Sequence, residues 1–441
     1  MLGIVVSRAD SASVHVGEHL RSLADWTEHE DDSRPDAAGG GTVYRLPDAE
    51  LREFEDLHIY LDGVGDTFAG VDCIAFASRH AGDTGNLLTA HHTGNFGAGE
   101  YGGEAGHFAR AAPNAHKRVV EAFDRHVPEG YEVGMECTHH GPTDLTTPSL
   151  FVELGSDESA WDDPAGAEAV ARAILDLRGV DPTSDRTLVG FGGGHYVPRF
   201  ERIVRETDWC VGHVGADWSL ESMDGPDPAV FRRVFEASGA SRAVVEGDRP
   251  GLESRIEDLG YRVVSETWAK ETTGVPLELV DHLEREVASV EEGLRFGANV
   301  HDVATPADLR VETLPGELLD EANGIDGDRA LERVREHVVA AVTDEAGTRL
   351  AGPVVLGAGP REAVVDELVA VLAGKYDAVE RREGVLVARE TAFDPELAHE
   401  RGVPEGPAFG KLAGGQAVEV DGETVDPSSV RREREVRFSL S

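Results

Sequence analysis

The stretch ECTHHGPTDLTTPSLFVELGSDESAW, residues 136–161, joins two strand-like segments and concentrates groups that bind metals or transfer protons. It holds Glu136, the adjacent His139 and His140, and Glu153 inside the apolar run SLFVELG. That run predicts a buried β-strand. A carboxylate in such a strand must be paired, ligated or exposed, because an unpaired buried charge costs too much free energy.

Two interpretations of Glu153 follow from this requirement. The carboxylate can ligate a metal ion or accept a hydrogen bond from a metal-bound histidine. It can equally pair with an arginine such as Arg199, which would give it a purely structural role. For each polar group taken singly, the structural interpretation is favoured.

On both sides of this stretch, apolar strand-like segments alternate with amphipathic helical segments. Strands are predicted at LGIVVS, CIAFASRH, YEVGMECT and TLVGF, and helices at HKRVVEAFDRHV and PAGAEAVARAILDL. Such alternation with short links predicts an α/β fold with a mostly parallel sheet flanked by helices. In sheets of this kind, ligands bind at the carboxyl ends of the strands.

The composition changes near residues 272–274, which predicts two domains. We expect a catalytic core over residues 1–272 and a smaller α/β domain over residues 275–441. The second domain is predicted to contain long helices at residues 277–296 and 328–345 and to end in β-hairpins. Its role is not indicated by the sequence.

The charge of the chain is strongly acidic, with 84 Asp and Glu against 41 Lys and Arg and a formal net charge of −43. The acids are dispersed, and the only lysines are Lys117, Lys270, Lys375 and Lys411. This pattern favours adaptation to molar salt over a cation-binding role. A nucleic-acid substrate is not excluded, because the Debye length at molar salt is only about 3 Å.

The cysteines and the N-terminus indicate a cytoplasmic protein. Cys73, Cys137 and Cys210 are far apart and odd in number, which argues against a disulfide framework or a cysteine-based zinc site. The start MLGIVVSRADS predicts a first strand and not a signal peptide. Apolar runs long enough to cross a membrane are absent from the sequence.

Histidines follow at least five of the predicted strands. They are His80, His91 with His92, His139 with His140, His195, and His213. Because the carboxyl ends of parallel strands share one edge of a sheet, we expect these imidazoles to converge there. Period-two alternation along MECTHH predicts that His139 and His140 face opposite sides, with strand twist letting both approach the site.

A glycine-rich turn, Gly192-Gly193-Gly194-His195-Tyr196, follows the strand TLVGF and precedes a helix. Glycines in this position let the backbone approach a ligand closely, often a phosphate. The spacing differs from the Walker and dinucleotide patterns, so a nucleotide cofactor is only weakly indicated.

Imidazole and carboxylate are the preferred zinc ligands where cysteine is scarce. Zinc with an open coordination position lowers the pKa of bound water to about 7, and a nearby Glu can accept or return protons. The residues therefore predict a metal-dependent hydrolase acting on a carbonyl or phosphoryl centre. Other zinc hydrolases, such as an amidase or peptidase, and a non-catalytic RNA-binding module with structural histidines remain as alternatives.

Taken together, the motifs resemble those of the archaeal-type D-aminoacyl-tRNA deacylases, a family also found in plants. The resemblance extends to about residue 270, and the remainder is an extension. Departures are His92, where an apolar residue is common, and Phe96, where Trp is common. The matching segments are ASRH (77–80), LTAH (88–91), TGN (93–95), YGG (101–103), Glu136 with THHGP (138–142), Glu153, Gly155-Ser156, Trp161, GGGHY (192–196), Pro198 and Gly212-His213.

The resemblance implies zinc-dependent hydrolysis of the ester joining a D-amino acid to the tRNA 3′ end. It also implies a core related to phosphorylase and peptidyl-tRNA hydrolase folds, two zinc ions per subunit, and no obligate protein partner. The implied metal ligands are His91, His139, His140, His195 and His213. The candidates for proton transfer are Glu136, Glu153 and His140. The candidates for substrate contact are His80, Asn95, Thr138, Gly192, Gly193, Gly194 and Tyr196.

Overall fold

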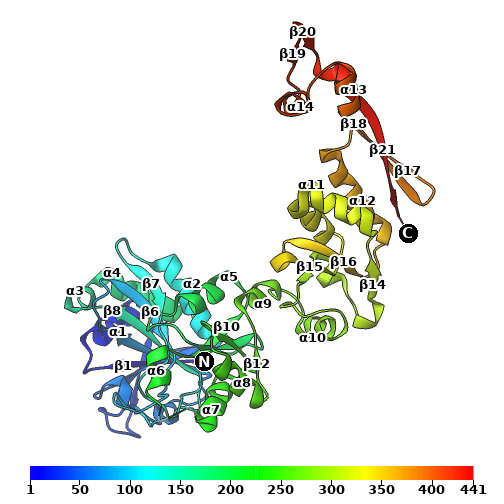
Figure 1. Ribbon diagram of the computed structural model, residues 1–441. Coiled ribbons are helices and arrows are strands. Elements are labelled where there is room, and N and C mark those ends of the chain that lie inside the picture. Colours follow the sequence, from blue (N-terminus) through cyan, green and yellow to red (C-terminus); the bar gives the residue numbers. More distant parts are fainter. Residues whose placement is uncertain (224, 226, 441) are drawn as a thin grey trace. The chain divides into compact units, whose positions relative to one another are not determined.

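The computed structural model describes residues 1–223, 225 and 227–440. The chain forms two compact units, Met1–Thr273 and Gly274–Ser441 (Figure 1). Both contain helices and sheets, and the α/β prediction is confirmed. Within the described residues, none of the helices combines the length and the apolarity that crossing a bilayer requires.

The first unit is built around an eight-stranded sheet with the order β2-β3-β4-β1-β5-β8-β6-β7. Strands β4, β1, β5 and β8 are mutually parallel, β6 is antiparallel to β8, and β7 is parallel to β6. Strands β2 and β3 complete the far edge in antiparallel pairs. The strands are β1 (Leu2–Ser7), β2 (Thr27–Asp31), β3 (Gly41–Leu46), β4 (Ala49–Phe54), β5 (Cys73–Arg79), β6 (Leu87–His91), β7 (Glu132–Met135) and β8 (Ser149–Gly155).

A second, fully parallel sheet of the same unit has the order β10-β9-β11-β12. Its strands are β9 (Thr187–Phe191), β10 (Cys210–Gly215), β11 (Arg242–Val245) and β12 (Arg262–Val263). The helices of the unit are α1 (Ser11–Leu23), α2 (Pro113–His126), α3 (Glu158–Trp161), α4 (Pro164–Leu175), α5 (Pro198–Glu206), α6 (Asp217–Glu221), α7 (Pro228–Ser238), α8 (Pro250–Asp258) and α9 (Glu266–Glu271), with 3-10 turns η1 (His58–Tyr60) and η2 (Val64–Thr67).

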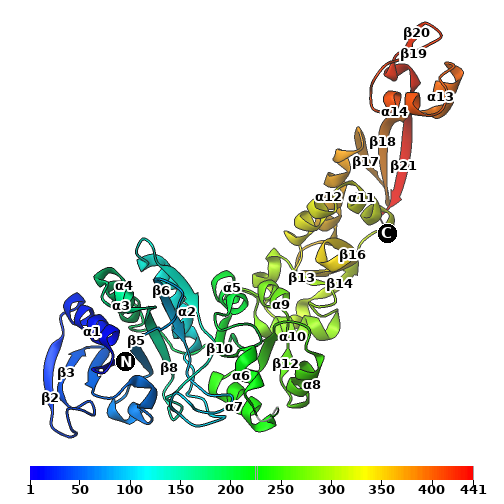
Figure 2. The same cartoon turned by 60° about the vertical axis from the view of Figure 1, so that its left-hand side comes forward.

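The two faces of the large sheet are covered differently. Helices α1, α2 and α4 pack on one face, where Leu150, Val152 and Leu154 of β8 join their core (Figure 2). Alternation along β8 turns Phe151 and Glu153 to the opposite face. Phe151 there joins a smaller core with residues of the η2 region and later loops. Loops and not helices therefore cover the face that receives Glu153.

The sequence predicted that the histidine-bearing strands would all end at one edge of the sheet, and this prediction is wrong. Strand β6 runs antiparallel to β8, with Leu87 opposite Gly155 and His91 opposite Phe151. His91, the last residue of β6, therefore lies over the face of the sheet. The chain brings it there from the opposite direction to His80, which follows β5. His213 lies inside β10 and not after it.

The predicted strand MECTHH is also shorter than expected, because β7 ends at Met135. Glu136 forms an isolated bridge with Tyr196, and the Thr138 backbone N–H donates to the Val214 carbonyl at 2.8 Å. The segment thus leaves the large sheet and runs against residues of the second one. His140 has φ of +46°, in the left-handed region, which ends the strand-like alternation of side chains.

The second unit contains an antiparallel sheet ordered β13-β15-β16-β14, a three-stranded sheet β17-β18-β21 and the hairpin β19-β20. Both predicted long helices end early, since α10 stops at Glu286 and α11 at Arg335. The apolar segment after α11 instead forms β15 and pairs with β16, so tertiary pairing overrides its helical pattern.

The elements of the second unit are α10 (Leu277–Glu286), β13 (Leu294–Phe296), η3 (Ala298–Asp302), η4 (Pro306–Asp308), β14 (Arg310–Thr313), α11 (Gly316–Arg335), β15 (Ala340–Asp344), η5 (Glu345–Gly347), β16 (Arg349–Leu356), α12 (Arg361–Val371), η6 (Leu372–Gly374), β17 (Ala378–Arg382), β18 (Val385–Phe393), α13 (Pro395–Glu400), α14 (Pro407–Ala413), β19 (Val418–Val420), β20 (Glu423–Val425), η7 (Pro427–Val430) and β21 (Arg431–Ser439).

Candidate active site

A cleft of about 700 Å³ opens in the first unit, on the loop-covered face of the large sheet. Most of the residues predicted to carry chemistry line it or lie directly beneath it. The lining imidazoles and carboxylates are His58, His80, His139, His140, His195, Asp10, Glu100, Glu136 and Glu153. His91 is fully buried under this cluster, with its ring centroid 4.3 Å from that of His139.

His91, His139 and His140 form a compact group of imidazoles. Each is hydrogen-bonded through Nδ1 to a backbone carbonyl: His91 to His92 at 3.1 Å, His139 to Cys137 at 2.9 Å and His140 to Gly141 at 2.6 Å. A ring that donates from Nδ1 presents an unprotonated Nε2. One ligand atom from each ring lies within 4.8 Å of the other two, so the three rings are prepared to hold a cation.

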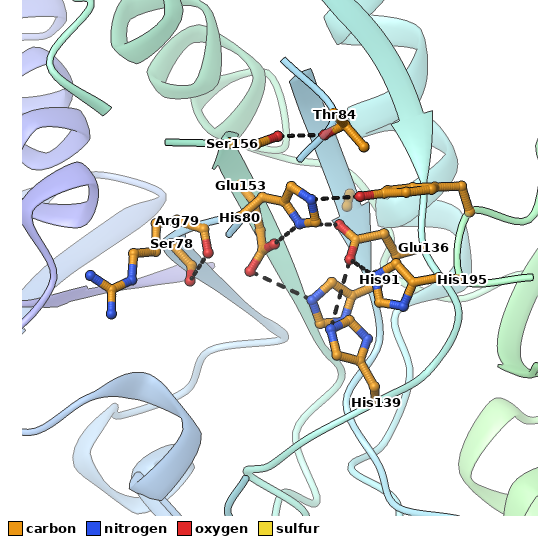
Figure 3. A network of polar contacts seen from close by, with 12 residues as sticks. Ser78, Arg79, His80, Thr84, His91, Glu136, His139, Glu153, Ser156 and His195 are labelled. Atoms are coloured by element: carbon orange, nitrogen blue, oxygen red, sulfur yellow. Dashed lines mark hydrogen bonds and ion pairs between the residues drawn. The ribbon is translucent and has the colours of Figure 1, made fainter. Parts of the chain in front are cut away.

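Two carboxylates connect these rings to a second group (Figure 3). Glu153 lies 3.6 Å from His91 Nε2 through Oε1 and 3.6 Å from His80 Nδ1 through Oε2. Glu136 lies 3.1 Å from His80 Nδ1 through Oε1 and accepts a hydrogen bond from His195 Nε2 at 2.6 Å through Oε2. His80, Glu136 and His195 also bring ligand atoms within 4.8 Å of one another. The cluster is continuous from His140 to His195.

The arginine interpretation of Glu153 is wrong. Arg199 contacts Glu266 at 3.3 Å instead. Glu153 is nevertheless 3% exposed, and its charge is balanced by imidazoles alone. A buried carboxylate held only by histidines is an arrangement typical of metal sites.

Two buried atoms of the cluster face charged neighbours without a well-aligned hydrogen bond: His91 Nε2 lies 3.6 Å from Glu153 Oε1, and Glu136 Oε1 lies 3.1 Å from His80 Nδ1. Leaving such a group unsatisfied costs about 1–3 kcal/mol. Both atoms are potential metal ligands, and both face other donor atoms of the cluster. The donor set therefore fits a metal ion, supplied by imidazole nitrogens and carboxylate oxygens.

The charges of the site follow from burial and pairing. Burial by itself lowers the pKa of His80, but its ion-pair contacts with Glu136 and Glu153 raise it to about 11. Burial raises the pKa of Glu153, but its ion-pair contacts with His80 and His91 lower it to about 2. Burial lowers the pKa of His140 to about 4, with His91 adding to the effect, and burial holds the pKa of His139 well below its usual range. His139 and His140 are thus neutral at pH 7, as metal ligation requires.

Three of the expected substrate contacts hold other residues in place. The Tyr196 hydroxyl lies 2.8 Å from His80 Nε2 and orients that ring. Asn95 lines the cleft but donates through Nδ2 to the Gly102 carbonyl at 2.9 Å, which fixes the loop. Thr138 lines the cleft while its hydroxyl contacts His213 Nδ1 at 3.1 Å.

Gly192, Gly193 and Gly194 are not among the residues that line the cleft, which corrects the expectation that they contact substrate. A Cβ on Gly193 would lie 2.7 Å from Glu246 Oε2, and one on Gly192 would lie 2.8 Å from the Glu246 carbonyl oxygen. Both have positive φ, +102° at Gly192 and +85° at Gly193. At Gly192 and Gly193, glycine makes room for Glu246 and permits the turn, so the ligand interpretation of this motif is not supported by its position.

His213 is not brought to the cluster, which corrects its expected role as a metal ligand. Its ring is fully buried, and both nitrogens are engaged, Nδ1 with the Thr138 hydroxyl and Nε2 with the Ala109 carbonyl at 2.9 Å. No lone pair remains to bind a cation. His213 instead ties the segment after β7 to β10.

Burial lowers the pKa of His213 to about 4. The unfolded chain binds a proton to this residue near pH 6.5 and the folded chain does not, so its contribution to stability is lost as pH falls through that window. We expect about 3 kcal/mol of destabilisation from this residue between pH 7 and pH 4. Urea unfolding of the wild type and His213→Gln at several pH values tests this, and an unchanged pH slope in the variant would contradict it.

Some residues of the cleft were not expected from the sequence. His58 was not among the predicted site residues, but it lines the cleft and contacts Ser13 Oγ at 3.2 Å. Arg79, Tyr101 and Trp218 also line the cleft. In the sequence, Arg79 directly precedes His80 and Tyr101 belongs to the YGG segment, so these two residues could have been predicted. Trp218 carries no such signal.

The family model and the relatives that match this chain carry the same description. The family model described as D-aminoacyl-tRNA deacylase matches residues 67–264. Relatives named D-aminoacyl-tRNA deacylase occur in Natronomonas pharaonis, 56% identical over 100% of both chains, and in Halorubrum lacusprofundi, 54% identical over 100% of this chain and 97% of that one. The relative from Haloarcula marismortui is 54% identical over 100% of both chains.

A crystal structure described as a conserved protein of unknown function, AF0625, matches with a TM-score of 0.56 and 27% identity. It covers 62% of this chain and 98% of its own. The halophilic relatives, by contrast, match over the whole length of this chain, including residues 274–441. On the strength of these full-length matches, the chain belongs to the D-aminoacyl-tRNA deacylase family.

Proposed function

We propose that this chain hydrolyses the ester bond between a D-amino acid and the 3′ end of tRNA, releasing both, with zinc as its metal. The observation that carries the proposal is the group His91, His139 and His140, whose Nδ1 atoms all contact backbone carbonyls and whose ligand atoms converge. Since charged tRNA is a cytoplasmic molecule, we place the reaction in the cytoplasm.

Zinc suits the donor set better than a thiolate-preferring or an all-oxygen metal does. Cys137 can form a group with His139 and His195. Burial raises the pKa of its thiol to about 12, however, so it stays protonated unless a metal displaces the proton. The first ion would be held by His91, His139 and His140.

A second ion per subunit would be held by His80, Glu136 and His195. Although burial lowers the pKa of both His80 and His91, their contacts with carboxylates outweigh burial and raise it, so metal binding at either site would displace a proton. Metal titration followed by calorimetry distinguishes one class of site from two.

When bound in such a site, zinc lowers the pKa of water to about 7 and polarises a carbonyl. Side chains of the cluster supply the proton transfers and the orientation of the ligands. Glu136 is kept ionised, because contacts with His195 and His80 outweigh the effect of burial and hold its pKa well below the usual range. Its Oε1, which lies 3.1 Å from His80 Nδ1, can accept the proton of the attacking water. Glu153 orients His91. With only the three-histidine site loaded, His80 keeps its proton and can return it to the departing ribose oxygen.

Removal of metal is the direct test. We expect purified protein to contain zinc, to hydrolyse D-aminoacyl-tRNA in molar salt, and to leave the L-aminoacyl-tRNA of the same amino acid intact. Treatment with a chelator should abolish turnover, and added zinc should restore it. Full activity after metal removal, checked by elemental analysis, would contradict the mechanism.

The same preparation separates the two alternatives. Hydrolysis of free D-aminoacyl esters or N-acyl amino acids without activity on charged tRNA would indicate a different zinc hydrolase. Binding of tRNA without turnover, with metal present, would indicate a non-catalytic protein. Either result would replace the proposed function.

A further inference from the structure

Beyond the metal cluster, the cleft carries two aromatic side chains that face solvent. Tyr101 is 68% exposed and Trp218 is 47% exposed, and both line the cleft. Among the described residues, the other large apolar side chains with comparable exposure are Tyr60 and Val311, and neither lines the cleft. Exposed aromatic surface beside a functional site is typical of ligand contact.

Trp218 is half-exposed and lies beside His195. It belongs to α6 and its ring centroid lies 6.4 Å from that of His195, with 27° between the two planes. The indole thus extends the surface of the cluster outward from His195, which itself is bonded to Glu136.

The lining of the cleft, among the described residues, offers few fixed positive charges for the recognition of phosphate. Apart from its histidines, Arg79 is the single basic residue among those that line the cleft, while Asp10, Glu100, Glu136 and Glu153 are acidic. A flat neutral ring is better matched to this surface than a polyanion is. Aromatic side chains hold unpaired nucleobases by stacking, because every base presents a π-face.

We propose that Trp218, supported by Tyr101, is the stacking platform for the terminal nucleobase of the tRNA 3′ end. The inference rests on the proposed function. The scissile ester is attached to the ribose of the terminal nucleotide, so its base must lie within one nucleotide of the reacting carbonyl. A platform that begins at His195 meets this condition, because His195 belongs to the second group of metal-capable residues.

The test compares Trp218→Ala, Trp218→Phe and Tyr60→Ala on three substrates. These are D-aminoacyl-tRNA, the D-aminoacyl ester of adenosine, and the methyl ester of the same D-amino acid, which has no base. For Trp218→Ala we expect kcat/KM to fall about 10- to 100-fold on both base-containing substrates, mainly through KM. The methyl ester should be unaffected, Trp218→Phe should recover most of the loss, and Tyr60→Ala should match the wild type.

Two outcomes overturn the proposal. An equal loss on all three substrates would mean that Trp218 acts by supporting His195. A loss on tRNA but not on the adenosine ester would place its contact elsewhere on the tRNA. If the wild type hydrolyses no D-aminoacyl-tRNA, the proposed function fails separately. Binding of adenosine monophosphate by wild type and Trp218→Ala, measured by calorimetry, then decides the stacking role alone, and equal affinities would overturn it.

Discussion

Replacement of His91 by asparagine is expected to remove the metal of the three-histidine site and to lower kcat/KM on D-aminoacyl-tRNA by roughly 1,000-fold or more. His91 supplies a buried Nε2 without a well-aligned hydrogen bond, and it has no substitute in the three-histidine group. Loss of a bound metal removes several kcal/mol of transition-state stabilisation, which corresponds to a rate factor of this size. Metal content and single-turnover deacylation are the measurements.

His92→Asn is the matched control for this variant. His92 is as buried as His91, at 2% against 1% exposed, and is likewise bonded through Nδ1 to a backbone carbonyl, that of Gly212 at 3.1 Å. It belongs to none of the metal-capable groups. Asparagine can donate the same bond in both variants, so general destabilisation should be similar. Equal metal loss in the two variants would show that His91 has no special role.

The second large effect is expected for Glu136→Gln, which should keep the fold and the metal of the three-histidine site but lower kcat by about 10²- to 10⁴-fold. Glutamine preserves the shape of the side chain, but its amide cannot accept a proton from water. The substitution also removes a charge that raises the pKa of His80. The basic limb of the kcat profile, where His80 loses its proton, should therefore move to lower pH.

Glu104→Gln serves as the control for charge removal. Glu104 lies 3.6 Å from His107 in an exposed pair away from the cluster, and neither residue lines the cleft. The wild-type rate is expected for this variant. An unimpaired Glu136→Gln enzyme would remove Glu136 from the mechanism and leave Glu153 as the remaining carboxylate.

The tertiary structure changes how the histidines are understood. Residues near strand ends were expected to meet because parallel strands share an edge, and His80 follows β5 in this way. His91 reaches the cluster by the opposite route, because β6 is antiparallel to β8. His213 and the glycines at 192–194 had the same sequence context as the others, yet they lie outside the cluster. Their partners, Ala109 and Glu246, are distant in sequence and could not be anticipated.

The sequence by itself determined the α/β class, the polar cluster around residues 136–153 and the acidic surface. These depend on local periodicity, on the presence of a carboxylate inside an apolar strand, and on composition. Only the tertiary structure decided which imidazoles converge, which nitrogen each presents, and that Trp218 borders the cleft. Strand direction, the left-handed backbone at His140 and the carbonyls that hold each Nδ1 fix those features, and all three arise from contacts that form only when the chain is folded.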